Sequence, residues 1–254
     1  MLFRSLVQLV SLDFAAKKPD AALERVKRQI SLAPQSAQLQ VVLGRVYMAR
    51  KEKNPAEAAF TKAIEMDPNL TIAYMALGQL YLSSKEYDQA LVKLQDAFKI
   101  NPKNFSALML VGIIRQEKGD IPKAQEAFEQ VLSIKPDFAP AANNLAYLYS
   151  EHGGSMDKAL ELANKARMAA PEDPHVGDTL GWILYKKGKI EQAVTSLQLS
   201  ASKLPDNPEV QYHLGMAYHK QGNSEAAKQA LGKALQLSAN FHGADEARRV
   251  LSQL

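Results

Sequence analysis

The chain has 254 residues, of which 46% are hydrophobic and 23% charged, with a formal net charge of +4. It contains no cysteine, which excludes disulfide bonds and thiol chemistry. The basic residues early in the chain lack interleaved aromatic side chains suited to base stacking, so we expect no nucleic-acid binding. No apolar run approaches the roughly 18 residues that a membrane-spanning helix needs, so the sequence predicts no transmembrane segment.

Six prolines recur at a nearly constant distance along the chain. Their spacings are 34, 34, 34, 35 and 34 residues, at Pro34, Pro68, Pro102, Pro136, Pro171 and Pro205. A glycine series keeps the same phase, at Gly44, Gly78, Gly112, Gly181 and Gly215. So does an alanine series, at Ala56, Ala90, Ala124, Ala159, Ala193 and Ala227. Because three independent series agree, the chain is one structural unit copied end to end.

Each predicted repeat is a helical hairpin. Phasing on the prolines gives seven repeats, at residues 3–36, 37–70, 71–104, 105–138, 139–173, 174–207 and 208–241. Within a repeat, apolar residues recur at helical spacing in two blocks, for example around Leu77 and around Leu94. The in-phase glycines predict helix crossings, because a larger side chain would push the two backbones apart. Between the blocks, Gly119, Gly188 and Gly222 predict left-handed helix ends.

The first repeat is the weakest copy, and no capping helix precedes it. Residues 1–5, Met-Leu-Phe-Arg-Ser, are what a common short-read sequencing adapter encodes when it is translated from a GTG start. An uncapped end is unexpected for a complete repeat protein. We therefore expect residues 1–5 to be an assembly artefact, and the chain to be a monomeric fragment of a longer protein that continues upstream.

The other end of the chain predicts a capping helix over residues 242–254. Apolar residues form one stripe of this helix, at Ala247, Val250, Leu251 and Leu254. Charged residues occupy the other face, at Asp245, Glu246, Arg248 and Arg249. Such a helix covers the apolar side that the last repeat would otherwise expose to water.

The clearest repeats carry a pattern of Leu-Gly-x-x-Tyr, then Ala and an aromatic residue or Leu, then Pro. One copy has Leu43-Gly44, Tyr47, Ala56, Phe60, Ala63 and Pro68, and the next has Leu77-Gly78, Tyr81, Ala90, Leu94, Ala97 and Pro102. This pattern resembles the tetratricopeptide repeat (TPR). The resemblance implies an all-α, right-handed superhelical solenoid of about seven helical hairpins plus the C-terminal capping helix.

No catalytic pattern is present in the sequence. It lacks a glycine-rich phosphate loop, a His-Glu-x-x-His zinc motif and a Gly-x-Ser-x-Gly nucleophile elbow. The five histidines are dispersed, and His213 and His219 lie six residues apart, on opposite sides of one predicted helix. We expect no enzyme activity, no metal and no cofactor, and interpret the chain as a binding protein.

The TPR resemblance implies that the first helix of each repeat lines a concave groove. Residues of these helices outside the Leu-Gly-Tyr pattern are therefore candidates for partner binding. In repeats five to seven they are aromatic and polar, as is typical of binding hot spots: Asn143, Asn144, Tyr147, Asp178, Trp182, Tyr185, Tyr212, His213, Met216 and His219. In repeats two to four they form a secondary apolar groove suited to an apolar helix or strand: Val41, Arg45, Met48, Met75, Gln79, Leu82, Met109 and Ile113.

Each part of this groove has a structural alternative. Trp182, the only tryptophan, is the strongest candidate anchor, and a place in the hydrophobic core is its alternative. The aliphatic residues have the alternative of packing between adjacent first helices. Recognition of a C-terminal carboxylate is disfavoured, because the nearest clamp residues, Arg45 and Asn143 or Asn144, lie several repeats apart.

The segment from Asn143 to Tyr218 is similar to the C-terminal repeats of the large bacterial TPR lipoprotein of exosortase (PEP-CTERM) and exopolysaccharide systems. That resemblance implies a scaffold for a protein or peptide segment in envelope polysaccharide or protein-sorting machinery, at a periplasmic or outer-membrane location. Two alternatives stay open. One is a cytosolic adaptor or chaperone-like module, and the other is the repeat region of a larger enzyme such as a glycosyltransferase.

Overall fold

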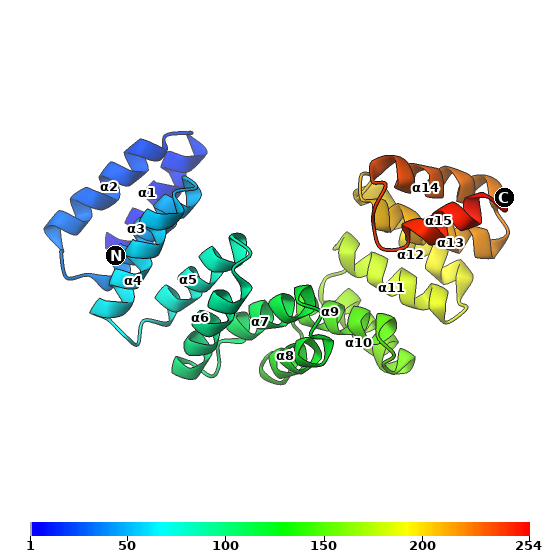
Figure 1. The fold of residues 1–254 in the computed structure, drawn as a ribbon, viewed down its shortest axis with the longest axis horizontal. Coiled ribbons are helices and arrows are strands. Elements are labelled where there is room, and N and C mark those ends of the chain that lie inside the picture. Colours follow the sequence, from blue (N-terminus) through cyan, green and yellow to red (C-terminus); the bar gives the residue numbers. More distant parts are fainter. Residues whose placement is uncertain (1) are drawn as a thin grey trace. The chain divides into compact units, whose positions relative to one another are not determined.

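The computed structural model describes residues 2–254, so Met1, part of the expected artefact, lies outside the described residues. The chain divides into two compact units, which we call the N-terminal body (Met1–Ala127) and the C-terminal body (Phe128–Leu254). Residues 2–254 form fifteen α-helices and no strand (Figure 1). Each body is an all-α repeat solenoid, as the sequence predicts.

The N-terminal body contains seven complete helices, joined by short turns. They are α1 (Leu2–Ala15), α2 (Pro19–Leu32), α3 (Ala37–Ala49), α4 (Lys53–Met66), α5 (Thr71–Ser83), α6 (Tyr87–Ile100) and α7 (Phe105–Glu117). Helix α8 (Ile121–Ile134) begins in this body and ends in the next. Consecutive helices from α1 to α7 contact each other, and α3 also contacts α5.

The C-terminal body continues the alternation of first and second helices. Its helices are α9 (Ala139–Glu151), α10 (Met156–Ala169), α11 (Pro174–Lys186), α12 (Ile190–Lys203), α13 (Pro208–Gln221), α14 (Ser224–Leu237) and α15 (Ala244–Leu251). Helix α11 contacts both α9 and α13, so neighbouring first helices touch. Helix α15 packs on α13 and α14 and buries Ala247 and Val250. The capping role of α15 stays a prediction.

One residue at the end of each first helix has a left-handed backbone. These residues share one phase of the repeat: Lys17, Lys51, Lys85, Gly119, Gly153, Gly188 and Gly222. The next residue donates its N–H to a carbonyl five positions back, as from Glu52 to Tyr47 at 2.9 Å and from Lys189 to Leu184 at 2.9 Å. This bond is the Schellman motif, which satisfies a carbonyl left free by the helix end. The prediction of left-handed turns at Gly119, Gly188 and Gly222 is confirmed.

The in-phase glycines lie where the two helices of a repeat cross. A Cβ at Gly78 would lie 2.8 Å from Cγ of Leu94, and one at Gly181 would lie 2.6 Å from Cγ of Leu197. Both distances are too short for real carbon atoms, so a side chain there would force the helices apart. The predicted reason for glycine is confirmed at these positions.

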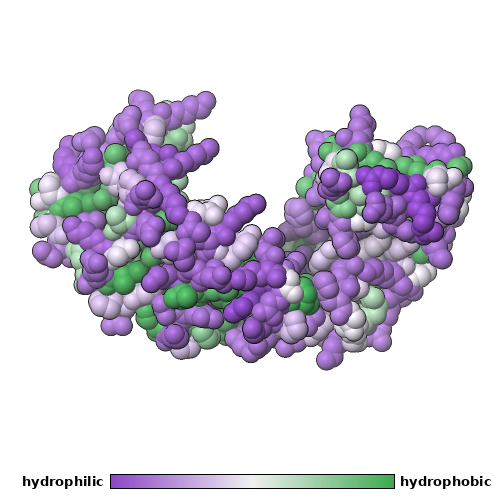
Figure 2. Space-filling model, in the orientation of Figure 1, coloured by the Kyte–Doolittle hydropathy of each residue, from purple (hydrophilic) through white to green (hydrophobic). Residues whose placement is uncertain are grey.

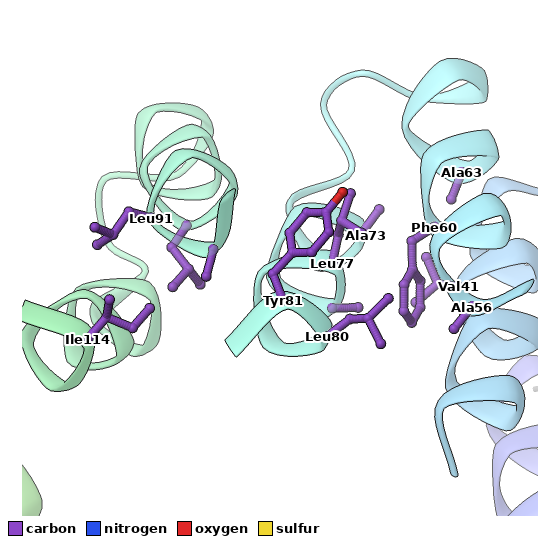
Figure 3. Packing of buried hydrophobic residues seen from close by; sticks show 13 residues of the cluster. Val41, Ala56, Phe60, Ala63, Ala73, Leu77, Leu80, Tyr81, Leu91 and Ile114 are labelled. Carbon is purple, nitrogen blue, oxygen red and sulfur yellow. The ribbon is translucent and has the colours of Figure 1, made fainter. Parts of the chain in front are cut away.

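The core of the N-terminal body runs between successive helices. Figure 3 shows Phe60 of α4 pointing at Leu80 of α5, with Ala56 beside it. Phe60 is fully buried, and burial of such a side chain contributes roughly 1.5–3 kcal/mol. The second helix of one repeat therefore packs on the first helix of the next.

Candidate functional site

The first helices of repeats five to seven are α9, α11 and α13, and we call them the inner helices of the C-terminal body. They carry the predicted partner-binding residues of this body. Helices α11 and α13 each begin with a proline in the first turn. Before these prolines, Asp173 accepts the N–H of His175 at 2.9 Å, and Asn207 accepts the N–H of Val210 at 3.1 Å. These N-caps fix where each inner helix starts, and hence which side chains of neighbouring helices meet.

Trp182 lies in a cluster of stacked rings. Its ring stacks on Tyr185, with centroids 4.8 Å apart and planes 9° apart, and on His213, at 4.2 Å and 19°. Tyr212 adds a tilted contact at 5.7 Å. Only 8% of Trp182 is exposed. Of its two interpretations, the structure therefore supports a core residue rather than an exposed anchor.

Glu151, the last residue of α9, connects this ring cluster to two further polar groups. Its Oε1 accepts hydrogen bonds from Nε1 of Trp182 at 2.8 Å, Nζ of Lys186 at 2.6 Å and Oγ of Ser150 at 3.2 Å. Burial raises the pKa of the carboxyl, but the hydrogen bond and charge of Lys186, with the bonds from Trp182 and Ser150, outweigh it. The net effect lowers the pKa of Glu151.

His213 is buried with a carboxylate partner. Its Nδ1 lies 3.0 Å from both oxygens of Asp178, which belongs to the preceding inner helix. A buried imidazole needs such a partner, because an unpaired polar nitrogen would cost free energy. This pair joins α11 to α13 in addition to the ring contacts.

The C-terminal segment closes the other side of the ring cluster. Phe241 meets Tyr212 with ring centroids 5.7 Å apart. Gly243 has φ of 99° and lies so close to the Tyr212 ring that a Cβ would clash with it. Val250 of α15 belongs to the same buried cluster as Trp182. Neighbouring rings and this segment bury four of the predicted partner-binding residues, which leaves little of their surface for a partner: Trp182, Tyr212, His213 and Met216.

The remaining candidates of the C-terminal body are half-buried: Asn143, Asn144, Tyr147, Asp178, Tyr185 and His219. Burial is the main reason why the pKa of Tyr147 rises to about 12, and the nearby carboxylates of Glu151, Glu209 and Asp178 add to it. Oδ1 of Asn143 is buried and accepts no hydrogen bond from the described residues. Tyr147 and Asn143 are four residues apart and so share one face of α9. We call the half-buried set of Asn143, Asn144, Tyr147 and Asp178 the polar rim.

The secondary apolar groove of the N-terminal body is more open. Val41 is buried in the core between helices, in line with the packing alternative for this set. The other apolar members are half-buried, at Met48, Met75, Leu82, Met109 and Ile113. Met48, Met75 and Leu82 pack against the core cluster, while Arg45 and Gln79 are exposed. The same half-buried side chains could thus pack between adjacent helices and also contact a partner.

The described residues contain neither a metal-binding cluster nor a membrane-spanning helix. Across residues 2–254, no group of three His, Asp or Glu side chains is placed to hold a metal ion. In the same part of the chain, none of the helices combines the length and the apolar character needed to cross a membrane.

Sequence reasoning missed Glu151 and the segment from Phe241 to Gly243. Glu151 lies two residues after Tyr149, outside the Leu-Gly-x-x-Tyr pattern, and nothing in its spacing along the chain marks it. A signal did exist, because a buried tryptophan needs an acceptor for its indole N–H, and Glu151 and Asp178 are the only carboxylates on α9 and α11. The ring contact of Phe241 depends on the path of a loop, which periodicity does not predict.

The fold and the sequence both match known repeat proteins. A family model described as the TPR domain of cytochrome c-type biogenesis protein H matches residues 14–142, just over half of the chain. Tetratricopeptide repeat models match residues 115–183, 181–222 and 208–241. The chain therefore belongs to the tetratricopeptide repeat family, and residues 14–142 form a TPR domain of the cytochrome c-type biogenesis protein H type.

Three individual proteins illustrate the likeness. A TPR repeat-containing protein of Pseudomonas aeruginosa is 31% identical over 81 residues, which cover 32% of this chain and only 14% of that protein. A chain of the APC/C hetero-tetramer Cut9-Hcn1 has a TM-score of 0.74 at 16% identity, and the match covers 96% of this chain and 48% of that chain. YrrB, a TPR protein with an unusual peptide-binding site, has a TM-score of 0.59 at 22% identity, covering 76% of this chain and 99% of YrrB. The two structural likenesses show the fold alone.

Proposed function

We propose that the chain is a non-catalytic protein–protein interaction scaffold that holds a partner segment on the polar rim of the C-terminal body. The observation that carries this proposal is the buried Oδ1 of Asn143, which accepts no hydrogen bond from the part of the chain that the structure describes. A buried acceptor without a partner costs free energy, and a peptide N–H or a side-chain donor from a partner would satisfy it.

The surroundings of the polar rim favour a basic segment. The carboxylates of Glu151, Asp178 and Glu209 place negative charge near the Tyr147 phenol and help to raise its pKa. A lysine or arginine of the partner would meet negative charge there, while its hydrocarbon stem would cover the Tyr147 ring. His213, which is itself stacked on Trp182, holds the carboxylate of Asp178 in place, so this side chain loses little entropy on binding. A peptide-binding role is in line with the TPR fold, and with YrrB, which is described as having an unusual peptide-binding site.

The test uses a random peptide library panned against the whole chain. We expect enrichment of peptides with Lys or Arg, and a loss of affinity of about tenfold or more when Asn143 and Tyr147 are both changed to Ala. The matched control is Asn164→Ala, an exposed asparagine on second helix α10. Hydrogen exchange of α9 in each variant verifies that the helix is still folded. Equal affinity in the double variant and the control would refute the polar rim as the site.

The biological setting is a finer part of this proposal. The resemblance of residues 143–218 to the TPR lipoprotein of exosortase systems supports envelope exopolysaccharide or protein-sorting machinery. The match of residues 14–142 to the TPR domain of cytochrome c-type biogenesis protein H favours a second candidate, a scaffold in cytochrome maturation. Neighbouring genes and the proteins that co-purify with the native protein distinguish these settings from a cytosolic adaptor, and from the repeat region of a larger enzyme.

A further inference from the structure

Helix α1 has two apolar faces, of which only one is covered. Leu6 and Val10 pack against Ala22 and Val26, in a buried cluster with α2 and α3. Leu9 and Leu12 belong to the other side of the helix, where they are 42% and 63% exposed. Leucine at such exposure leaves apolar surface in water, which costs roughly 25 cal/mol for each Å². We call Leu9 and Leu12 together the α1 face.

The repeat itself shows that these two positions are normally interior. The residues in the phase of Leu12 are all at most 3% exposed: Val46, Leu80, Ile114, Leu148, Ile183 and Ala217. In the phase of Leu9, Leu77, Leu145 and Leu214 are at most 7% exposed, and Leu43, Val111 and Leu180 are half-buried. The α1 face is therefore equivalent to a surface that later first helices bury. On α1, none of the described residues covers it.

The cover at the later positions has a constant chemistry. Val46 shares a buried cluster with Ala22 and Val26 of α2, which precedes it. Leu80 shares one with Ala56 and Phe60 of α4, as Figure 3 shows. Ala217 does the same with Ala193 and Leu197 of α12. In each case a second helix presents a small residue and, four positions later, a larger apolar residue, so that both point at the same first helix.

We propose that the α1 face is a docking surface for a helical hairpin of a partner polypeptide. The second helix of that hairpin carries an alanine followed four residues later by Leu, Val or Phe. Helix α1 then receives it as α5 receives α4, which continues an interface that the chain repeats internally. This surface and its partner are distinct from the polar rim.

A second copy of this chain does not fit the α1 face. The second helices of such a copy are already used inside its own stack. The outward side of its last helix, α15, exposes the charged residues Asp245, Arg248 and Arg249. Pairing of α1 with α1 would bury only two leucines from each chain. Their surface area is far below the roughly 800 Å² per partner that stable interfaces bury. Hydrophobic surface is visible at the α2 side of the N-terminal body in Figure 2.

The probe for this proposal is a peptide that copies residues 37–70, a hairpin whose second helix contains Ala56 and Phe60. We expect it to bind the full chain with a micromolar to millimolar dissociation constant, and to slow hydrogen exchange in α1 by about tenfold or more. The same 34 residues fused ahead of residue 3 raise the effective concentration to the millimolar range and give the same protection even if the free peptide does not fold.

Two controls make the result decisive. Changing Leu9 and Leu12 to Asp in the chain should remove the protection of α1 from hydrogen exchange, and it leaves the exposed surface polar. Changing the Phe60 position of the probe to Asp should also remove this protection. If α1 exchanges equally fast with and without the fused hairpin, the proposal is overturned. It is also overturned if the double Asp variant stays protected, or if sedimentation shows that the unmodified chain self-associates through α1.

Discussion

The inner helices of the two bodies have the same backbone but different side chains at equivalent positions. Eight residues after the start of the predicted repeat, the N-terminal body has the exposed Arg45 and Gln79 and the half-buried Ile113. At the same phase, the C-terminal body has the half-buried Tyr147 and the buried Trp182 and Met216. At this position the Trp182 ring reaches Tyr212 and His213 of the next inner helix, α13, and is buried among them. The repeat therefore fixes the backbone, while single side chains decide whether an inner face is open or filled.

The difference extends to the turns that follow the inner helices. Left-handed residues of the first three repeats are lysines, with φ of 57°, 63° and 59°, at Lys17, Lys51 and Lys85. In the C-terminal body all three are glycines, at Gly153, Gly188 and Gly222. Only glycine adopts this region without steric cost. The C-terminal body is thus both better filled inside and less strained at its turns.

The largest expected effect comes from removing the ring that fills the C-terminal body. Trp182→Ala leaves a cavity between α11 and α13 and removes one donor from Glu151, so we expect a loss of about 3–5 kcal/mol. Gln79→Ala, at the equivalent exposed position, should change stability by less than about 0.5 kcal/mol. Hydrogen exchange resolved by helix measures both, since repeat arrays need not unfold in two states. Similar effects for the two variants would contradict the comparison of filled and open inner faces.

A smaller effect separates crossing glycines from a spare one. Gly181→Ala adds a Cβ about 2.6 Å from Leu197, so overpacking of roughly 1–3 kcal/mol exceeds the helix-propensity gain of about 1 kcal/mol. Gly232 lies inside α14 with no atom near its missing Cβ, so Gly232→Ala should stabilise by about 0.5–1 kcal/mol. Opposite signs in urea unfolding are expected. The same sign for both substitutions would exclude the crossing as the reason for Gly181.

Acid should weaken the C-terminal body through Glu151. Its pKa in the folded state lies below the unfolded value of 4.5, so its contribution is present above pH 4.5 and is lost as pH falls through the folded pKa. We expect Glu151→Gln to cost about 1–2 kcal/mol at neutral pH, after allowing for solvent screening of the exposed part of the carboxyl. The cost should shrink on acidification. A constant difference between wild type and variant from pH 7 down to pH 3 would contradict this assignment.

The sequence predicts the helices, their pairing and the crossing glycines, because these depend on periodicities that the chain repeats. It does not predict which groove residues are exposed. Trp182 and Gln79 occupy the same phase, and only the sizes of their neighbours, with the path of the Phe241 loop, bury one and expose the other. Likewise, Lys85 occupies the phase of Gly188, but no pattern of glycines reveals a left-handed lysine. Contacts between repeats at non-repeating positions thus require the structure.

The smallest expected effect concerns these lysine turns. At Lys85, φ of 59° costs a residue with a Cβ roughly 1–2 kcal/mol, and glycine avoids this cost. Glycine in turn loses about 0.5–1 kcal/mol more backbone entropy on folding. The balance favours Lys85→Gly by about 0.5–1 kcal/mol, which corresponds to a rise in Tm of roughly 1–4 °C for a chain of this size. The matched variant in the C-terminal body is Gly188→Ala, where φ is 73° and no atom lies near the added Cβ, so that only backbone strain acts and Tm should fall by a similar amount. Differential scanning calorimetry measures both shifts. If Lys85→Gly leaves Tm unchanged or lower, contacts of the lysine side chain offset its strain, and the turns of the two bodies are equally stable despite their different residues.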